Sequence, residues 1–453
     1  MTTEHAIAYA TRSTLDARGL GLATSGGREA HPHFFEGFLE QPEQVARALL
    51  AIAEVSRTRY FDPGVRARMK DPVVTSNLTV LRFESFSSCN GVYARLDIDA
   101  AGFDAQHLDW GTTNVDLNEP VRAALAGVGS GEPLRLTVGA ESLGVETLTG
   151  AAVEERVPLP ERWLRGFSEA QIAQADMAPV ARLEGAAARA AIRDLPRLRT
   201  GRRTPWVSFG TGPVRVTSVS TGQVAALVEP RRLETLGRVA RWARSLTVYA
   251  PPMRSRVALA GAGAAPAALQ PSAWVVELEG ARYTLVISPE QWRGFSGEGH
   301  VLTSLAGVDE AHVARVERLL EGQAALDPAA LATTTGLDEA TAGAALAVLG
   351  AAGRVGFDLT AGAYFHRDLP YDRSALAQAQ PRLRDAWELV TAGAVTAGTG
   401  QGEWVVNSAG TRYPVTLAPE GDRCLCPWFA KHRGERGPCK HVLAATLTAT
   451  AQR

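Results

Sequence analysis

The chain has 453 residues, of which 45% are apolar and 21% charged, and its formal net charge is -1. This composition is typical of globular proteins and excludes wholesale disorder, a fibrous fold and a protein that coats nucleic acid by bulk charge. The length predicts several domains, because one core serves roughly 100 to 200 residues.

The expected compartment follows from what the sequence lacks. It has no run of about 18 uncharged apolar residues, and its first residues lack the basic and then apolar layout of a secretory signal. We therefore expect a cytoplasmic protein. Three of the four cysteines cluster near the C-terminus, whereas Cys89 stands alone and is expected in a core. This distribution favours metal binding over a disulfide framework.

The N-terminal half predicts an extension followed by an α+β domain. Residues 1–70 are predicted to be a helical extension of loop and helix, with apolar periodicity from Glu43 to Ser56. Residues 71–170 are predicted to form the α+β domain. Its strands start with residues 73–87 and 91–98, which alternate apolar and polar side chains.

An internal repeat organises the middle of the chain. PERWLRGFS at 160–168 recurs as PEQWRGFS at 289–296, and each copy follows a predicted strand. Residues 171–300 are therefore predicted to be a second, related α+β domain, with helices at 168–195 and 228–245. Each copy is either a docking surface built from Trp and Phe or a repeated core anchor, and we favour the anchor.

The most basic stretch lies inside the second domain. From Arg193 to Arg256 there are thirteen arginines against three acidic residues. We favour solvated surface and intramolecular pairing, and keep open a nucleic-acid backbone or an acidic protein as partner. The candidate contacts for such a partner are Arg202, Arg203, Arg231 and Arg232.

Residues 301–375 resemble a winged helix-turn-helix domain. Three predicted helices at 309–322, 327–336 and 338–353 precede two short strands. The third helix offers no Arg, Lys, Asn or Gln to a DNA groove and starts with two carboxylates, so we predict a scaffold or protein-docking role. Near the wing, Arg354 and Arg367 are placed to touch a DNA backbone without specifying sequence.

A zinc motif ends the chain, after a helical linker predicted at 376–402. In residues 403–453 a predicted hairpin leads into C-x-C-x12-C-x-H. One structural Zn2+ is predicted, held by Cys424, Cys426, Cys439 and His441. This closed Cys3His set leaves no coordination position for a water nucleophile. His432 lies in the same loop, but the C-x-H spacing favours His441.

The motif and the upstream hairpin resemble the SWIM zinc finger. The stretches RFESFSSCNGVYARLD at 82–97 and GTTNVDLN at 111–118 resemble the N-terminal parts of bacterial SWIM proteins of about this length. The resemblance implies contacts with DNA or protein rather than catalysis. It also implies partners of the kind encoded beside such proteins, a MoxR-type AAA+ ATPase and a von Willebrand A-type protein. The surface expected to make these contacts is a basic rim of Lys431, Arg433, Arg436 and Lys440.

The sequence contains no P-loop, nucleophile elbow, HExxH or dinucleotide fingerprint with the flanks that such an enzyme motif requires. The first domain does contain acidic residues able to bind a divalent cation, although we favour solvated loops for them: Asp97, Asp99, Asp109, Asp116 and Glu119.

The predicted fold class is α+β multidomain, with two related α+β domains, a winged-helix-like module and a C-terminal SWIM zinc finger. The predicted function is that of a non-catalytic zinc-binding adaptor or scaffold that engages a protein partner. Nucleic acid is a further ligand that the finger could bind. The alternative is a DNA-binding transcription or repair regulator. An uncharacterised enzyme in the N-terminal half is the third option.

Overall fold

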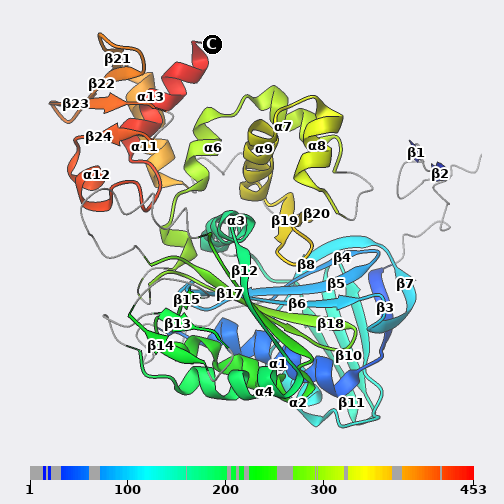
Figure 1. Cartoon of the computed structure of the whole chain (residues 1–453). Helices are drawn as coiled ribbons and strands as arrows, with labels where there is room; N and C mark the ends of the chain where they lie inside the picture. Colours follow the sequence, from blue (N-terminus) through cyan, green and yellow to red (C-terminus); the bar gives the residue numbers. More distant parts are fainter. Residues whose placement is uncertain are drawn as a thin grey trace, which may run out of the picture.

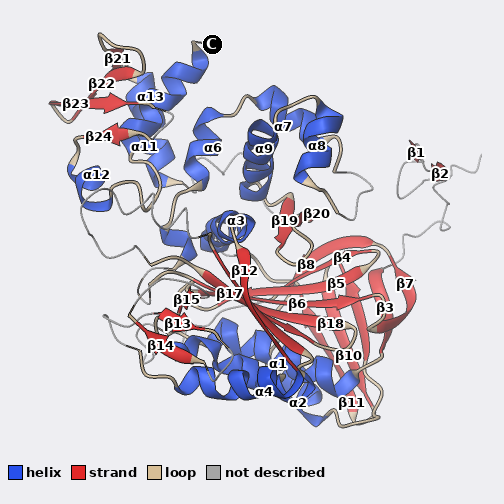
Figure 2. Ribbon diagram, viewed as in Figure 1, coloured by secondary structure: helices blue, strands red, loops and turns tan. Residues whose placement is uncertain are grey.

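The computed structural model describes residues 14–16, 19–21, 32–60, 72–159, 161–200, 206–210, 214–218, 224–252, 269–290, 292, 294–320, 325–369, 380–418 and 421–452. Within these residues, helices and strands contribute similar shares (Figure 2). No helix among them is both long and apolar enough to cross a membrane.

An eight-stranded antiparallel sheet forms the centre of the molecule (Figure 1). Its order is β12 (Ala178–Glu184), β16 (Ser245–Ala250), β17 (Ser272–Glu277), β18 (Ala281–Ile287), β6 (Val92–Asp99), β5 (Val80–Phe86), β4 (Val73–Asn77) and β8 (Trp110–Asn114). Strands from the two predicted α+β domains meet at β18 and β6, which pair from Ala281 opposite Ile98 to Ile287 opposite Val92. The segments on either side of the predicted boundary at residue 170 therefore contribute strands to one continuous sheet.

Smaller sheets and helices complete this body. A five-stranded sheet has the order β11 (Gly150–Glu155), β10 (Ser142–Thr147), β9 (Arg135–Gly139), β3 (His33–Leu39) and β7 (Phe103–Leu108), and a three-stranded sheet joins β14 (Arg215–Thr217), β13 (Trp206–Ser208) and β15 (Val224–Ala226). Helices α1 (Pro42–Arg57), α2 (Glu119–Gly127) and α4 (Gly185–Asp194) lie together on one side (Figure 2). Short 3-10 helices are η1 (Leu195–Arg197), η2 (Pro230–Arg238), η3 (Ala240–Trp242) and η4 (Phe295–Gly297), and β1 (Thr14–Asp16) pairs with β2 (Gly19–Gly21).

Several predicted elements differ from the observed ones. The single strand predicted at 73–87 is the hairpin β4–β5, because Asn77 Oδ1 accepts hydrogen bonds from the main-chain N–H of Thr79 and Val80 and turns the chain. The helix predicted at 168–195 is interrupted by strand β12, and residues 228–245 form 3-10 turns in place of an α-helix. The segment predicted as a helical extension also contributes strand β3.

The two copies of the repeat dock on one turn, Ser87–Gly91, at the end of β5. The first copy starts α3 (Glu161–Ala175) and buries Trp163 and Phe167, whereas the second buries Phe295 and leaves Trp292 56% exposed. The core-anchor interpretation therefore holds for the first copy and for the Phe of the second.

The repeated glycines explain how closely both copies approach this turn. A Cβ on Gly166 would lie 2.8 Å from Asn90 Nδ2, and a Cβ on Gly294 would lie 2.2 Å from the carbonyl oxygen of Cys89. Asn90 joins the two copies, since its Nδ2 donates to the carbonyl of Arg162 at 3.0 Å and its carbonyl accepts from Phe295 N–H at 2.8 Å.

The helical module has the predicted order of elements. It consists of α7 (Glu310–Glu317), α8 (Pro328–Thr335), α9 (Glu339–Ala351), β19 (Val355–Asp358) and β20 (Ala363–His366), preceded by α6 (Val301–Gly307). Asp327 and Asp338 cap α8 and α9, as their sequence positions predicted, and α9 buries Leu346 and Leu349 in a core shared with α3. At Gly350 the helix is in close contact with Gln171 of α3, where a Cβ would meet the side chain at 2.4 Å.

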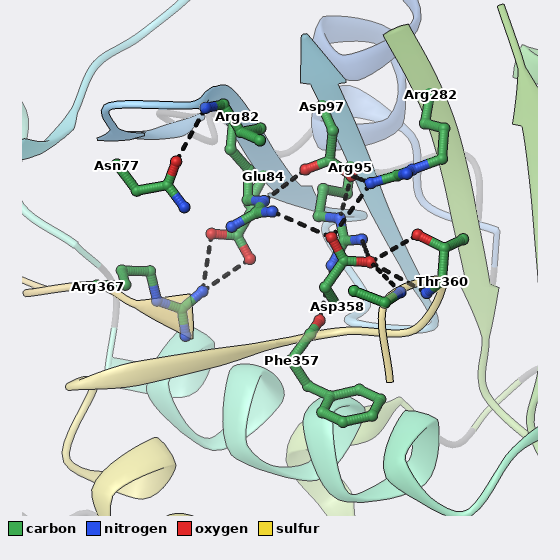
Figure 3. Close-up of polar contacts among 12 residues, drawn as sticks. Asn77, Arg82, Glu84, Arg95, Asp97, Arg282, Phe357, Asp358, Thr360 and Arg367 are labelled. Atoms are coloured by element: carbon green, nitrogen blue, oxygen red, sulfur yellow. Dashed lines mark hydrogen bonds and ion pairs between the residues drawn. The ribbon is translucent and has the colours of Figure 1, made fainter. Parts of the chain in front are cut away.

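A buried network of ion pairs, the charged seam, fixes hairpin β19–β20 to the sheet (Figure 3). The carboxylate of Asp358 lies 3.2 Å from Arg95, 3.2 Å from Arg282 and 3.4 Å from Arg82, which come from three neighbouring strands. Other members of the seam are Asp97, which binds Arg82 and Arg95, and Glu84, which accepts two hydrogen bonds from Arg367 at 2.7 and 2.8 Å. Apart from Arg282, whose side chain is 27% exposed, the charges that hold the hairpin are almost wholly removed from water.

The C-terminal part forms a separate layer at the end of the molecule (Figure 1). It contains α11 (Pro381–Thr391), a sheet with the order β21 (Val395–Ala397), β22 (Glu403–Ser408), β23 (Thr411–Thr416) and β24 (Arg423–Cys424), and helices α12 (Pro427–His432) and α13 (Lys440–Ala451). The predicted hairpin is confirmed, with its turn at Ala409 and Gly410, both at positive φ. Helix α11 packs on α13, and β21 extends the sheet, so this layer begins before the predicted position 403.

Candidate zinc site and the surface around it

Four side chains from three elements converge in the C-terminal layer. Cys424 ends β24, Cys426 is the N-cap of α12, Cys439 is the N-cap of α13, and His441 follows in the first turn of α13. Their donor atoms all lie within 4.8 Å of one another, and each residue is at most 5% exposed. The prediction that these four residues form one site is confirmed.

The geometry and donor set fit zinc. A tetrahedral zinc ion with Zn–S of about 2.3 Å and Zn–N of about 2.1 Å places neighbouring S and N atoms ~3.6 Å apart. The observed distance between Cys424 Sγ and His441 Nδ1 is 3.8 Å. These residues would hold one Zn2+ with no position left for substrate or water.

The thiols need a cation to be fully ionised together. The hydrogen bond with Cys424, together with burial, raises the pKa of Cys439 to about 12, and burial raises the pKa of Cys426 as well. A bound Zn2+ reverses this balance, because its charge deprotonates coordinating thiols. The N–H of Phe429 points at Cys426 Sγ at 3.3 Å, which stabilises a ligand thiolate.

Aromatic packing orients the histidine ligand. The ring of Tyr413, on β23, stacks on His441 with centroids 4.3 Å apart and planes 22° apart. Sequence reasoning did not single out Tyr413, although its place on the strand before the first ligand was a usable signal. His432, the alternative ligand considered from the sequence, contacts Trp428 instead, with ring centroids 4.8 Å apart.

One arginine joins the finger to the body, in what we term the junction. Arg382, on α11, donates to the main-chain carbonyls of Arg436 and Pro438 at 2.7 and 3.0 Å, and to that of Glu298 at 2.6 Å. Arg436 in turn donates to the carbonyl of Gly297. The loop between the two ligand pairs is therefore fixed to the segment that precedes α6.

A buried carboxylate completes the junction. Glu169, on α3, accepts hydrogen bonds from the N–H of His300 at 3.0 Å and of Val301 at 3.2 Å, the first groups of helix α6. Burial raises the pKa of Glu169 to about 7, although these N–H groups oppose the shift. Helix α6 then packs with α13 in the finger core.

The predicted basic rim divides into exposed and engaged residues. Lys431 and Arg433 are exposed on and just after α12, whereas Lys440 is half-buried, 4.0 Å from Asp385. Arg436 belongs to the junction. An apolar residue that sequence reasoning missed, Leu425, lies between two ligands and is 75% exposed.

The candidate contacts in the basic middle need one correction. Arg232 is wholly buried and donates to the carbonyls of Gly91 and Ser288 at 2.7 and 2.9 Å, so its prediction as a surface residue is wrong. The sequence shows the charge of Arg232, but it does not show that folding buries the side chain against two main-chain carbonyls. Arg231 is exposed and paired with Glu229 at 2.7 Å. Arg202 and Arg203 lie outside the described residues.

Other cations near this region also have intramolecular partners. Arg238, Arg241 and Arg244 pair with carboxylates of Glu54, Glu43 and Glu279, respectively. At the wing, Arg367 is 2% exposed in the charged seam, so it does not reach a DNA backbone. Intramolecular pairing, which we favoured from the sequence, accounts for these positions.

Comparison with known proteins identifies the C-terminal module. Residues 413–449 match the family model of the SWIM zinc finger, and these residues contain all four ligands. The chain therefore carries a C-terminal SWIM zinc finger. A comparison with curated proteins gave no match.

Two solved structures to which this chain is similar match it only weakly. One is proliferating cellular nuclear antigen from Entamoeba histolytica, at 11% identity and a TM-score of 0.37 over 57% of this chain and 99% of that chain. The other is described as the C-terminal region of FEN-1 bound to A. fulgidus PCNA, at 13% identity and a TM-score of 0.34 over 56% and 98%. These scores are too low to assign a fold or a function.

Proposed function

We propose that this chain is a non-catalytic adaptor that uses its zinc finger to hold a protein-binding surface. The observation that carries the proposal is the closed set of four ligands, with Leu425 exposed between two of them. A saturated metal shell fixes the backbone on both sides of Leu425 and offers no reactive position. The zinc ion is then structural, and the chemistry of the surface is binding.

The surface combines one apolar anchor with positive charge. Leu425 stands at the head of α12, and Lys431 and Arg433 are exposed at its other end. An exposed apolar residue rimmed by charged groups suits a protein partner with an apolar pocket and acidic edges. A MoxR-type AAA+ ATPase and a von Willebrand A-type protein remain the partners we propose, on resemblance.

The winged-helix-like module supports docking over DNA reading. Its third helix starts with Asp338 and Glu339, both exposed, and carries no Arg, Lys, Asn or Gln. Its wing is held in the charged seam. We propose that this module acts as a scaffold that connects the sheet to the finger through the core shared by α9 and α3.

A binding assay at two salt concentrations tests the proposal. The full zinc-loaded chain, Leu425→Ser and the double variant Lys431→Glu/Arg433→Glu are compared for binding to purified ATPase and A-domain proteins and to duplex DNA. An adaptor loses protein binding in Leu425→Ser and keeps most of it as salt rises. A nucleic-acid binder is unaffected by Leu425→Ser, loses DNA in the double variant, and weakens steeply between low and moderate salt.

A further inference from the structure

A buried carboxylate far from the zinc site has no basic partner in the part of the chain that the structure describes. Glu154, on edge strand β11, is 5% exposed, and its Oε1 has no hydrogen-bond partner among the described residues. Two other buried carboxylates of the body have basic partners. Asp358 meets three arginines, and Glu84 meets Arg367. Burying a charge without a counter-charge is energetically unfavourable, so a further group is expected to stabilise the carboxylate of Glu154.

A second carboxylate makes the position more acidic. Val115 bridges Arg156 in antiparallel fashion, which brings Glu154 alongside the segment that leads into α2. There Asp116 lies close enough to raise the pKa of Glu154, which burial also raises, to about 7. Among the described residues, no Arg, Lys or His is among the groups that shift it.

An amide oxygen at the same place also lacks a partner. Asn118 is the N-cap of α2, yet its side chain makes no capping hydrogen bond, and its buried Oδ1 accepts from no described group. An asparagine at this position ordinarily accepts from the first turn of the helix. The main-chain N–H of Asn118 does donate a hydrogen bond to Glu154. That bond and the helix N-terminus favour the ionised form of Glu154, whereas burial and Asp116 oppose it.

We propose that Asp116, Asn118 and Glu154 bind a hard divalent cation, Ca2+ or Mg2+, between the start of α2 and strand β11. Two carboxylates and an amide oxygen are the ligands that these ions take, and water completes the shell. The absence of sulfur and imidazole ligands separates the site from zinc chemistry. The ion would attach the edge strand of the five-stranded sheet to α2.

The structure distinguishes this set from the acidic residues considered from the sequence. Asp97 belongs to the charged seam, and Glu119 pairs with Arg122 at 2.9 Å. Asp99 and Asp109 accept hydrogen bonds from the N–H of nearby residues. Of those five, Asp116 is the one whose charge acts on Glu154, a residue that the sequence did not indicate because it lies on a strand almost forty positions later.

Calorimetry of the full zinc-loaded chain, dialysed into metal-free buffer and titrated with CaCl2 or MgCl2, tests the site. We expect saturable binding of one ion per chain and slower hydrogen exchange at residues 150–155. The ion with the lower Kd is the one that the site prefers. Glu154→Gln and Asp116→Asn should each weaken binding at least about tenfold, as expected for loss of one charged ligand.

Glu155→Gln is the matched control, because Glu155 is an exposed carboxylate on the same strand. It should bind as the unmodified chain does. Zinc content and circular dichroism establish that every variant is folded. Absence of saturable binding of both ions up to about 10 mM, well above the weak end of about 1 mM for protein calcium sites, overturns the proposal. Equal loss in Glu155→Gln also overturns it, since binding would then follow general charge.

Discussion

Two hairpins in the second half of the chain are attached to the body by arginines in different ways. Hairpin β19–β20 is held by arginines that meet the carboxylates of Asp358 and Glu84. The finger that contains β22–β23 is held by Arg382, which donates to three main-chain carbonyls. The first attachment therefore depends on ionised partners, whereas the second depends on a loop whose shape zinc preserves.

The largest expected effect comes from removing zinc. Structural zinc sites stabilise small modules by roughly 10 to 16 kcal/mol, so chelation or Cys439→Ser should unfold the finger while the central sheet stays folded. Hydrogen exchange should show lost protection in β22, β23 and α13 and unchanged protection in β5, β6 and β18. A metal-free chain that keeps its finger protected would sink the assignment of a structural zinc.

The seam should give the next largest effect. Among the described residues, Asp358→Ala leaves Asp97 as the carboxylate partner of two buried guanidinium groups and of a third, that of Arg282, which is 27% exposed. This change should lower the free energy of unfolding by about 3–5 kcal/mol. Asp368→Ala is the control. Asp368 pairs with Arg354 at the wing, but its side chain is 49% exposed, so we expect a loss below about 1 kcal/mol. Urea unfolding of both variants measures the difference, and similar losses would contradict the seam.

The zinc ligands and the seam differ in how far the sequence could predict them. The ligands lie within eighteen consecutive residues and have fixed spacing, so local pattern was enough to name all four. The seam joins Arg82 and Arg95 to Asp358, more than 250 positions away, and no local pattern encodes that contact. For the same reason Arg232 was assigned to the surface by its charge, although folding encloses it.

Element order was easier to predict than domain boundaries. The three helices and hairpin at 309–370 follow from caps and apolar spacing, which are local signals. The continuous sheet was not predictable, because the pairing of β18 with β6 joins segments almost 190 positions apart. The repeat was visible in sequence, but its meaning, two segments docked on Ser87–Gly91, required the structure.

A smaller effect is expected at that turn. In Gly294→Ala the new Cβ would lie 2.2 Å from the carbonyl oxygen of Cys89, so main chain must move, and we expect a loss of about 1–3 kcal/mol. Gly343→Ala, inside α9, is the control, because no atom of the described residues outside the helix backbone and the neighbouring residues lies within 4 Å of its Cβ position. Helix propensity predicts that it stabilises by up to about 1 kcal/mol. Thermal unfolding distinguishes the two signs, and a neutral Gly294→Ala would show that the turn adapts freely.

The smallest expected effect is the change of stability with pH, which has opposite signs for the seam and the junction. Burial alone would raise the pKa of Asp358, but Arg95, Arg82 and Arg282 lower it well below its usual range. Its contribution to stability is therefore complete above about pH 4, the ordinary pKa of Asp, and is lost as the pH falls further. Glu169 behaves oppositely, because its folded pKa of about 7 lies above the ordinary value of about 4.3.

The folded chain thus binds a proton at Glu169 more tightly than the unfolded chain does, so stability falls as pH rises through this interval. Lowering the pH from about 8 to about 6 should stabilise the junction by about 1 kcal/mol. Urea midpoints of the zinc-loaded chain and of Glu169→Gln, measured at both pH values, isolate this effect, because glutamine cannot titrate. If the urea midpoint of Glu169→Gln still changed with pH as much as that of the unmodified chain, the pH dependence would belong to other groups. The junction would then respond to zinc but not to pH.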